Sequence, residues 1–365
     1  MNIKNYLTTV LLLTVLLAGC KKDKEVLPEV TFSIAEDVVA TTVNTKITFK
    51  AAASNEKAIQ HEWRLNNEVK STNESYEFTP TKSGKYIIGY TASNAAGTFT
   101  RQYTVNASAP IKPITPESSL YVTKLIEYLP APGQFINKAP GNRISAESIL
   151  GKKGMVTLGA WGGYIVLGFD HTVINQLDKE DIIIYGNAGL TNAEPGIVWV
   201  MQDENGNGIA DDTWYEIAGS EFGKDGYIRN YEVTYTKPNP ATAKVAWKDN
   251  KGNSGFVETN VYHKQSYFPE WATDVYTLKG TLLPSRNINM TSPTNITSAP
   301  FGWGYADNTA GGDKIDIANA IDKEGKKINL EGIDFIKIQT SIQANMGWLG
   351  EFSTEVLGVA DMNLR

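Results

Sequence analysis

Apolar and polar side chains alternate along the first part of the chain, from about residue 29 to residue 108. Positions 47, 49 and 51 are apolar, whereas Thr48 and Lys50 between them are polar, which is the two-residue period of a half-buried β-strand. Trp63 stands in a similar stretch, where a central strand would bury it in a core. The turn-forming sequence Asn94–Gly97 separates two further strand-like runs, as in a hairpin. We therefore predict a small β-domain over residues 29–108.

The longer second part of the chain, residues 118–365, shows the same strand-like pattern and few helical stretches. Its β-branched and aromatic runs are bounded by turn-forming residues, which is typical of short strands joined by turns. The runs are 155–160, 164–169, 181–186, 196–200, 231–236, 335–338 and 356–359. We predict an all-β fold in which this second domain is a larger, sandwich-like structure.

A proline-rich segment separates the two predicted domains. Residues 109–117 contain Pro110, Pro113 and Pro116. Proline has no backbone N–H for a sheet and favours an extended chain, so we expect a semi-rigid linker here.

The N-terminus has the pattern of a secretion signal. Tyr6–Ala18 is an apolar run that is too short to span a bilayer as a helix, so we predict a signal peptide over residues 1–19. It is followed by cysteine in the sequence Leu-Ala-Gly-Cys, the pattern that a bacterial lipoprotein signal peptidase recognises. Cys20 is the only cysteine of the chain, and we predict that it carries lipid. Residues 20–28 would form a charged tether.

A lipidated Cys20 would hold the protein at a membrane while the rest of the chain stays in water. We expect an outer-membrane lipoprotein displayed on the cell surface. The net charge of −6 comes without a basic stripe, so we expect no nucleic-acid partner.

One loop of the second domain has the spacing of a calcium site. Oxygen-bearing groups alternate in the sequence from Asp203, and Gly208 allows a tight turn. The loop departs from the EF-hand at its twelfth position, which is Trp214 and not Glu. The alternative is a polar turn without metal. The predicted ligands of a structural calcium ion are Asp203, Asn205, Asn207, the carbonyl of Ile209, and Asp211.

Common catalytic motifs are absent from the sequence. There is no Gly-x-Ser-x-Gly elbow, no phosphate-binding loop and no zinc spacing among the three histidines. Asp170–His171 could act as a general base, but a structural hydrogen-bonded pair is the better interpretation. We predict a protein that is not an enzyme. A glycosidase pair of carboxylates stays open as an alternative, because the separation of such groups in space is not visible in a sequence.

Aromatic residues stand in glycine-rich stretches that resemble loops. Long loops without periodicity often bind ligands, and rings flanked by glycine offer flat apolar faces. The predicted ligand-binding residues are Trp303, Phe301, Tyr305, Trp348, Trp161, Met346, Asn345 and Asn308.

Two family resemblances bear on these predictions. The segment with Trp63 and Asn94–Gly97 resembles PKD and bacterial Ig-like modules, which implies a β-sandwich spacer. The second domain is similar to Bacteroidetes cell-surface proteins with such a module, including accessory lipoproteins of cobalamin (vitamin B12) uptake of the BtuH type. The segments that carry this second resemblance are 166–171, 184–188, 194–200, 205–216, 347–351 and 353–355.

The second resemblance implies that the C-terminal domain binds cobalamin noncovalently and assists its uptake by a TonB-dependent outer-membrane transporter. The Asp-x-His-x-x-Gly pattern of enzymes that bind cobalt through histidine is absent, because His171 directly follows Asp170. This favours carriage of the vitamin over cobalamin-dependent catalysis. Two alternatives remain: a glycan-binding protein or glycosidase, and an adhesin or structural surface protein.

Overall fold

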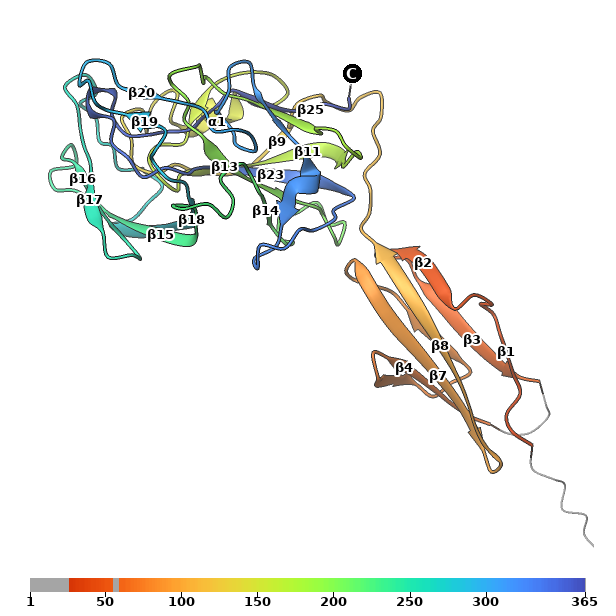
Figure 1. Ribbon diagram of the computed structural model, residues 1–365. Helices are drawn as coiled ribbons and strands as arrows, with labels where there is room; N and C mark the ends of the chain where they lie inside the picture. Colours follow the sequence, from red (N-terminus) through yellow and green to blue (C-terminus); the bar gives the residue numbers. More distant parts are fainter. Residues whose placement is uncertain (1–25, 55–58, 365) are drawn as a thin grey trace, which may run out of the picture. The chain divides into compact units, whose positions relative to one another are not determined.

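The computed structural model describes residues 26–54 and 59–364, and the chain forms two compact domains with a main boundary at Ser108 (Figure 1). The predicted signal peptide and Cys20 lie outside the described residues. The fold is all-β, as predicted. No helix in the described part of the chain has the length and apolar character needed to cross a membrane.

The first domain consists of two antiparallel sheets around an aromatic core. One sheet has the order β1 (Val30–Phe32), β3 (Ile47–Ala53), β6 (Ser75–Phe78). The other has the order β2 (Val38–Thr42), β8 (Gly97–Ser108), β7 (Gly84–Asn94), β4 (Gln60–Leu65), β5 (Glu68–Ser71). Trp63 is fully buried in this core, and the β7–β8 hairpin closes with Asn94 opposite Gly97. Both features were expected from the sequence.

The second domain is built on a six-stranded antiparallel sheet. Its order is β22 (Ala320–Ile321), β14 (Tyr215–Ile217), β13 (Gly196–Met201), β23 (Gly332–Thr340), β11 (Tyr164–Ile174), β9 (Lys124–Leu129). A three-stranded sheet shares a core with it and has the order β21 (Asp313–Ile315), β12 (Ile182–Tyr185), β25 (Gly358–Asp361).

Smaller elements complete this domain. A four-stranded sheet has the order β17 (Ser254–Val257), β16 (Val245–Asp249), β15 (Ile228–Thr236), β18 (Val275–Leu282). Two strand pairs are β10 (Val156–Thr157) with β24 (Glu355–Val356), and β19 (Ile288–Asn289) with β20 (Thr297–Ser298). The helical elements are α1 (Arg143–Glu147) and the 3₁₀ turns η1 (Ile317–Asn319) and η2 (Gly347–Leu349).

Two large hydrophobic cores lie against the sheets of the second domain. The larger joins the six-stranded and three-stranded sheets, and in it Ile336 and Ile338 of β23 cluster with Ile182 and Ile184 of β12. The other lies against the four-stranded sheet and contains Trp161. Burial of such apolar surface is the main favourable contribution to folding.

The predicted linker contains neither helix nor strand, but part of it is fixed to the second domain. The Lys112 N–H donates to Thr172 Oγ1 (2.9 Å), and the Lys112 carbonyl accepts from the Thr172 N–H (3.0 Å). Ala109 is buried. The segment is therefore attached to β11 at Lys112 and is not a free spacer along its whole length.

Candidate ligand-binding cavity

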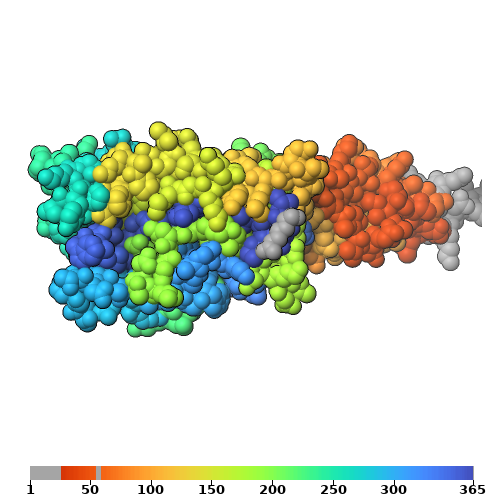
Figure 2. Space-filling view, turned by 90° about the horizontal axis from the view of Figure 1, so that it is seen from above, coloured from red at the N-terminus to blue at the C-terminus, as the bar shows by residue number. Residues whose placement is uncertain are grey.

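The second domain contains an open cavity of about 740 Å³. Segments that are far apart in the sequence form its wall, namely parts of 134–140, 187–194, 262–263, 296–298 and 346–355. Figure 2 shows one face of the domain, on which chain near the C-terminus (dark blue) lies between a yellow segment and green and light-blue segments. The volume lies within the range of roughly 300–1,000 Å³ that is usual for small-molecule sites.

One part of the wall is apolar. Met346, Leu349 and Ile296 line the cavity and also belong to, or pack against, a small buried cluster, which fixes their positions. The Trp348 ring lines the same cavity and is 52% exposed. This part of the wall can therefore cover an apolar surface of a ligand.

Two glycines explain how the turn η2 presents Trp348. Gly347 has φ +62° and Gly350 has φ +95°, which are values that favour glycine. A Cβ on Gly350 would lie 2.6 Å from the side-chain amide nitrogen of Gln134, so a larger residue would require this side chain to move. The sequence Gly-Trp-Leu-Gly thus forms a tight turn with a half-exposed ring.

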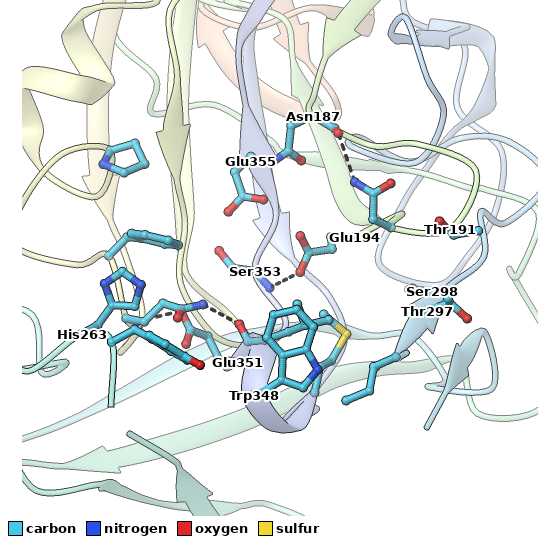
Figure 3. A pocket seen from close by; sticks show the side chains of 18 of the residues that line it. Asn187, Thr191, Glu194, His263, Thr297, Ser298, Trp348, Glu351, Ser353 and Glu355 are labelled. Carbon is cyan, nitrogen blue, oxygen red and sulfur yellow. Dashed lines mark hydrogen bonds between the residues drawn. The ribbon is translucent and has the colours of Figure 1, made fainter. Parts of the chain in front are cut away.

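Another part of the wall is acidic. Glu351, Ser353 and Glu355 alternate along one segment, and all three line the cavity (Figure 3). Glu351 Oε1 accepts from the Gln134 N–H (2.9 Å), whereas the buried Oε2 has no hydrogen-bond partner. Burial raises the pKa of Glu351 from 4.5 to about 8.

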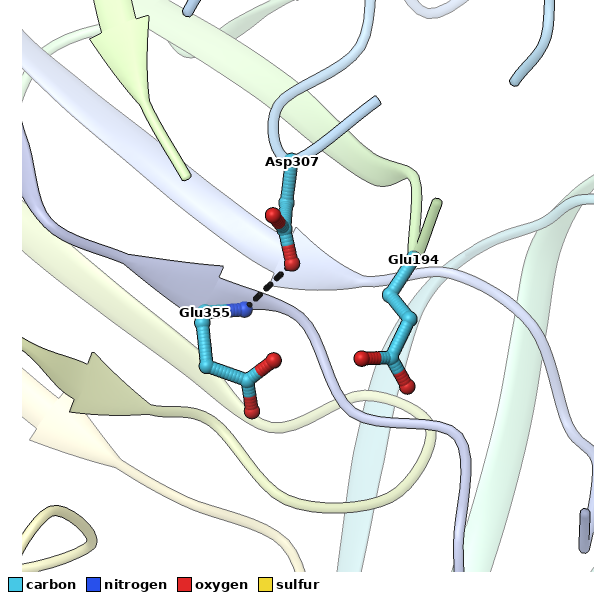
Figure 4. Close-up of side chains that lie close together, drawn as sticks. All are labelled: Glu194, Asp307 and Glu355. Atoms are coloured by element: carbon cyan, nitrogen blue, oxygen red, sulfur yellow. Dashed lines mark hydrogen bonds between the residues drawn. The ribbon is translucent and has the colours of Figure 1, made fainter. Parts of the chain in front are cut away.

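A group of three carboxylates lies beside this acidic part of the wall. It consists of Glu194, Asp307 and Glu355 and is called the carboxylate cluster below. One oxygen of each lies within 4.8 Å of the others. Figure 4 shows the three side chains pointing toward one another from three separate segments. Glu194 and Glu355 also line the cavity.

Backbone and hydroxyl donors hold the carboxylate cluster in place. Asp307 accepts from the N–H groups of Ala188 and Glu355, both at 2.9 Å. Glu194 Oε1 accepts from the Ser353 N–H (3.1 Å). Glu355 Oε1 accepts from the hydroxyl of its strand partner on β10 (2.7 Å). These bonds orient the carboxylates, and each side chain retains further acceptor capacity.

Basic residues do not balance the charge of the carboxylate cluster. Among the described residues, no lysine or arginine lines the cavity. His263 lines it, but burial and then the charge of Lys138 lower the pKa of this histidine, which therefore carries little charge at neutral pH.

The carboxylate cluster accordingly holds its protons strongly. Burial first, and then the neighbouring carboxylates, raise the pKa of Glu194 and of Asp307 well above the ordinary range. Burial also raises the pKa of Glu355.

Two of the predicted ligand-binding residues, Trp348 and Met346, line the cavity. Asn345 directly precedes them, and its side-chain oxygen accepts from the Gly347 N–H (2.9 Å). Asn345 therefore helps to form the turn.

Two predicted aromatic residues lie in the core. Trp161 and Tyr305 are fully buried and do not line the large cavity, so the structure does not bring these two predicted residues to it. The Trp161 ring packs edge-on against Tyr231, and the Tyr305 hydroxyl accepts from the Glu221 N–H (2.9 Å). Apolar burial therefore determines where these two rings lie.

Phe301, Trp303 and Asn308 do not line the large cavity either. Asn308 is buried, and its side chain bonds to the backbone N–H and carbonyl of Phe301 at 2.7 and 3.0 Å, which stabilises the loop. Trp303 is 51% exposed and lines a separate hollow of about 280 Å³.

The predicted calcium loop is held by its own hydrogen bonds and by a lysine. Asp203 accepts from the N–H groups of Asn207 (3.0 Å) and Gly208 (2.8 Å). The Lys112 ammonium lies 2.8 Å from Asp203 Oδ2 and 3.5 Å from Asp334 Oδ1. The loop thus forms a tight turn, and a lysine supplies positive charge at its first position. The calcium ion remains a prediction, and these contacts favour the alternative of a polar turn.

His171 is buried between two acidic residues. Its Nδ1 lies 2.7 Å from Asp170 Oδ1, and its Nε2 lies 2.9 Å from Asp361 Oδ2. Both ring nitrogens have partners within the fold, which agrees with the structural interpretation of this pair.

The acidic wall was not predicted from the sequence. Glu194, Glu351 and Glu355 lie in segments that carry the family resemblance, but none was predicted as a site residue. The usable signal was the alternation Glu-x-Ser-x-Glu at positions 351–355, directly after the glycine-flanked Trp348. No sequence pattern around Asp307 indicated that it is a site residue.

Comparisons with known proteins add little. No protein-family model and no curated protein matches the chain. A solved structure of carbohydrate-binding modules of the β-sandwich superfamily shares 12% identity, covering 93% of this chain and 100% of that chain, with a TM-score of 0.20. A SusE-like protein shares 8% identity over 91% of this chain and 95% of its own, with a TM-score of 0.19.

A quinonprotein alcohol dehydrogenase-like protein from Bacteroides thetaiotaomicron shares 10% identity over 92% of this chain and 96% of its own, with a TM-score of 0.24. At such identities and TM-scores, these similarities carry no argument about function. The functional conclusion therefore depends on the cavity.

Proposed function

We propose that the second domain binds cobalamin noncovalently in the 740 Å³ cavity and does not modify it. The observation that supports this is the division of the wall into an apolar part around Met346 and Trp348 and a polar part around Glu351 and Ser353. The family resemblance suggests the identity of the ligand.

The chemistry of the two parts suits such a ligand. A corrin has apolar edges and faces surrounded by amide groups. The half-exposed Trp348 ring can cover an apolar face, and carboxylate and hydroxyl oxygens elsewhere on the wall can accept hydrogen bonds from amide N–H groups. Because the cavity is open, a ligand larger than its volume can enter with one edge and leave the rest in solvent.

In this proposal the protein is anchored through lipid on Cys20 at the outer membrane, on the cell surface. The first domain acts as a spacer, and the second presents cobalamin to a TonB-dependent transporter. The anchoring rests on the Leu-Ala-Gly-Cys sequence at positions 17–20.

A glycan is the second candidate ligand, and one specific feature favours it. Trp348 offers an exposed ring in the same cavity as several carboxylates. Sugars can bind to such a combination by packing on the ring and by donating hydroxyl hydrogen bonds to the carboxylates.

Two tryptophans provide a matched test. Trp348 and Trp303 are 52% and 51% exposed, but of the two only Trp348 lines the large cavity. Loss of a ring that covers a ligand face costs about 1–3 kcal/mol, so Trp348→Ala should weaken cobalamin binding by roughly ten- to a hundredfold. Trp303→Ala should leave the affinity unchanged. Isothermal titration of the full chain with cobalamin measures both.

Three results would count against this proposal. Absence of heat with cobalamin, together with measurable binding of a polysaccharide, would support the glycan function. Equal losses in both variants would show that the ligand contacts another surface. Unchanged affinity in Trp348→Ala would place the ligand outside the cavity.

A further inference from the structure

The carboxylate cluster brings together three acidic side chains without a basic partner in the adjoining cavity wall, as far as the structure describes it. Asp307 is fully buried and Glu355 is 7% exposed. Burying an ionised carboxylate without a counter-charge is strongly unfavourable. Either protons or a cation must compensate this group.

The geometry of the carboxylate cluster matches a metal site. Its oxygens lie within 4.8 Å of one another. This is about twice the Ca²⁺–O distance of roughly 2.3–2.6 Å, so one ion can contact all three residues. Hydrogen bonds from the Ser353 N–H to Glu194 and from a hydroxyl to Glu355 orient these two carboxylates toward the same point.

A second observation, outside the carboxylate cluster, also indicates a missing positive partner. Glu351 is 4% exposed and lines the same cavity, and its Oε2 atom has no hydrogen-bond partner. Buried polar atoms are nearly always satisfied in folded proteins, so an orphaned carboxylate oxygen in an acidic cavity points to an absent donor or cation. The acidic part of the described cavity wall therefore lacks a positive partner at Glu351 as well as at the carboxylate cluster.

We propose that Glu194, Asp307 and Glu355 bind a hard divalent cation, of which Ca²⁺ is the best fit, at the floor of the cavity. All the donor atoms are oxygens, as Ca²⁺ prefers, and the open cavity admits the water molecules that complete its coordination. The ion site does not depend on which organic ligand the cavity binds.

The site differs from the calcium loop predicted from the sequence. At the loop, the Lys112 ammonium lies 2.8 Å from Asp203 and supplies the positive charge. At the carboxylate cluster, the described cavity wall contains no lysine or arginine. Substitutions in one site and in the other can therefore separate the two.

The experiment is calorimetric titration of the full chain with CaCl₂ after removal of metal with EDTA. For the wild-type protein we expect a single site with Kd of about 10⁻⁴ M, as in extracellular calcium modules. Glu194→Gln and Glu355→Gln should each weaken binding by about tenfold or more, because each removes a charged ligand. Asp203→Asn serves as the matched control and should leave the affinity unchanged.

A second measurement locates the ion and guards against loss of folding. Terbium(III) bound at the carboxylate cluster should be sensitised by Trp348, so Trp348→Phe should lower terbium luminescence, whereas Trp303→Phe should not. Glu194→Gln keeps an oxygen that can accept from the Ser353 N–H, so this variant should remain folded. Its tryptophan fluorescence reports whether it does.

The proposal is overturned if the wild-type protein binds no Ca²⁺, or if a folded Glu194→Gln variant binds it as tightly as wild type. It is also overturned if Asp203→Asn abolishes binding, which would assign the ion to the loop.

Discussion

The loop around Asp203 and the carboxylate cluster around Asp307 are both rich in acidic groups, but they differ in whether a basic residue compensates their negative charge. The loop acids are close together in the sequence, and Lys112 and backbone N–H groups satisfy the buried Asp203. The carboxylate cluster is assembled from distant segments, and no lysine or arginine stands in the described wall of the adjoining cavity.

The comparison shows that a group of acidic residues can form either a turn that needs no metal or a site that needs a cation. Spacing along the chain can produce a turn in which side-chain oxygens accept from the loop's own N–H groups. An external cation is needed where folding buries negative charge and no basic side chain of the protein lies nearby to compensate it. The second condition depends on tertiary structure.

The largest expected effect is on the pH dependence of stability, and it concerns the acidic cavity, whose described wall contains no lysine or arginine. The pKa of Glu351 in the folded protein is about 8, above the ordinary value of 4.5, so the folded protein holds a proton that the unfolded chain has lost. The resulting stability is complete below the ordinary pKa and is lost as pH rises toward the folded pKa. In metal-free buffer we expect the free energy of unfolding to fall by on the order of 3 kcal/mol between about pH 5 and pH 8.

Urea unfolding followed by tryptophan fluorescence measures this change, because Trp63 is the only tryptophan of the first domain and the signal reports mainly on the second. Glu351→Gln should reduce the pH dependence without abolishing it, because the raised pKa values of the carboxylate cluster act in the same direction. Glu331→Gln, at an exposed position, should leave it unchanged. A flat pH profile in the wild-type protein would contradict the prediction.

The next effect concerns the loop, where Lys112 compensates the negative charge of Asp203. Lys112→Met removes the ammonium that lies near Asp203 and Asp334, both of which are 1% exposed. The lysine side chain itself is 33% exposed. Removing one partner of a fully buried pair costs about 3–5 kcal/mol, and after allowing for solvent screening at the lysine we expect about 2 kcal/mol.

The same unfolding measurement in EDTA checks this value, and Lys327→Met, at an exposed position, is the control. If Lys112→Met were as stable as wild type, the balance of charge that we assign to the loop would be wrong.

The smallest effect concerns the exposed end of the loop. The Asp211 side chain accepts from the Asn205 and Asn207 side-chain amides at 3.2–3.4 Å. Exposed contacts of this kind contribute little, so Asp211→Ala should change stability by less than about 0.5 kcal/mol, with or without added calcium. Thermal melting in EDTA and in CaCl₂ measures both. A larger, calcium-dependent loss would restore the loop as a metal site.

Much of the fold could be predicted from the sequence because strand periodicity is local. The runs around Ile47, Tyr164 and Phe335 are strands in the structure, and Trp63 is a core residue as expected. Such patterns record which side chains face a core, and neighbouring residues suffice to show them.

The site was less predictable because it depends on contacts between distant segments. Trp348 and Trp161 both stand beside glycines, yet one lines the cavity and the other is buried against Tyr231. Sequence alone does not distinguish these environments. Asp307 joins Glu355 only through the folded chain, in which its carboxylate accepts from the Glu355 N–H.

The attachment of Lys112 also has a mechanical consequence for a chain that is anchored at its N-terminus as we propose. A pulling force along the linker meets a firm attachment at this residue, where hydrogen bonds to the Thr172 backbone N–H and hydroxyl and an ion pair to Asp203 resist it together. The load then passes into β11 and its neighbour β23, neither of which contributes to the cavity wall. A protein tethered in flowing fluid would thus bear tension without distorting the place where its ligand binds.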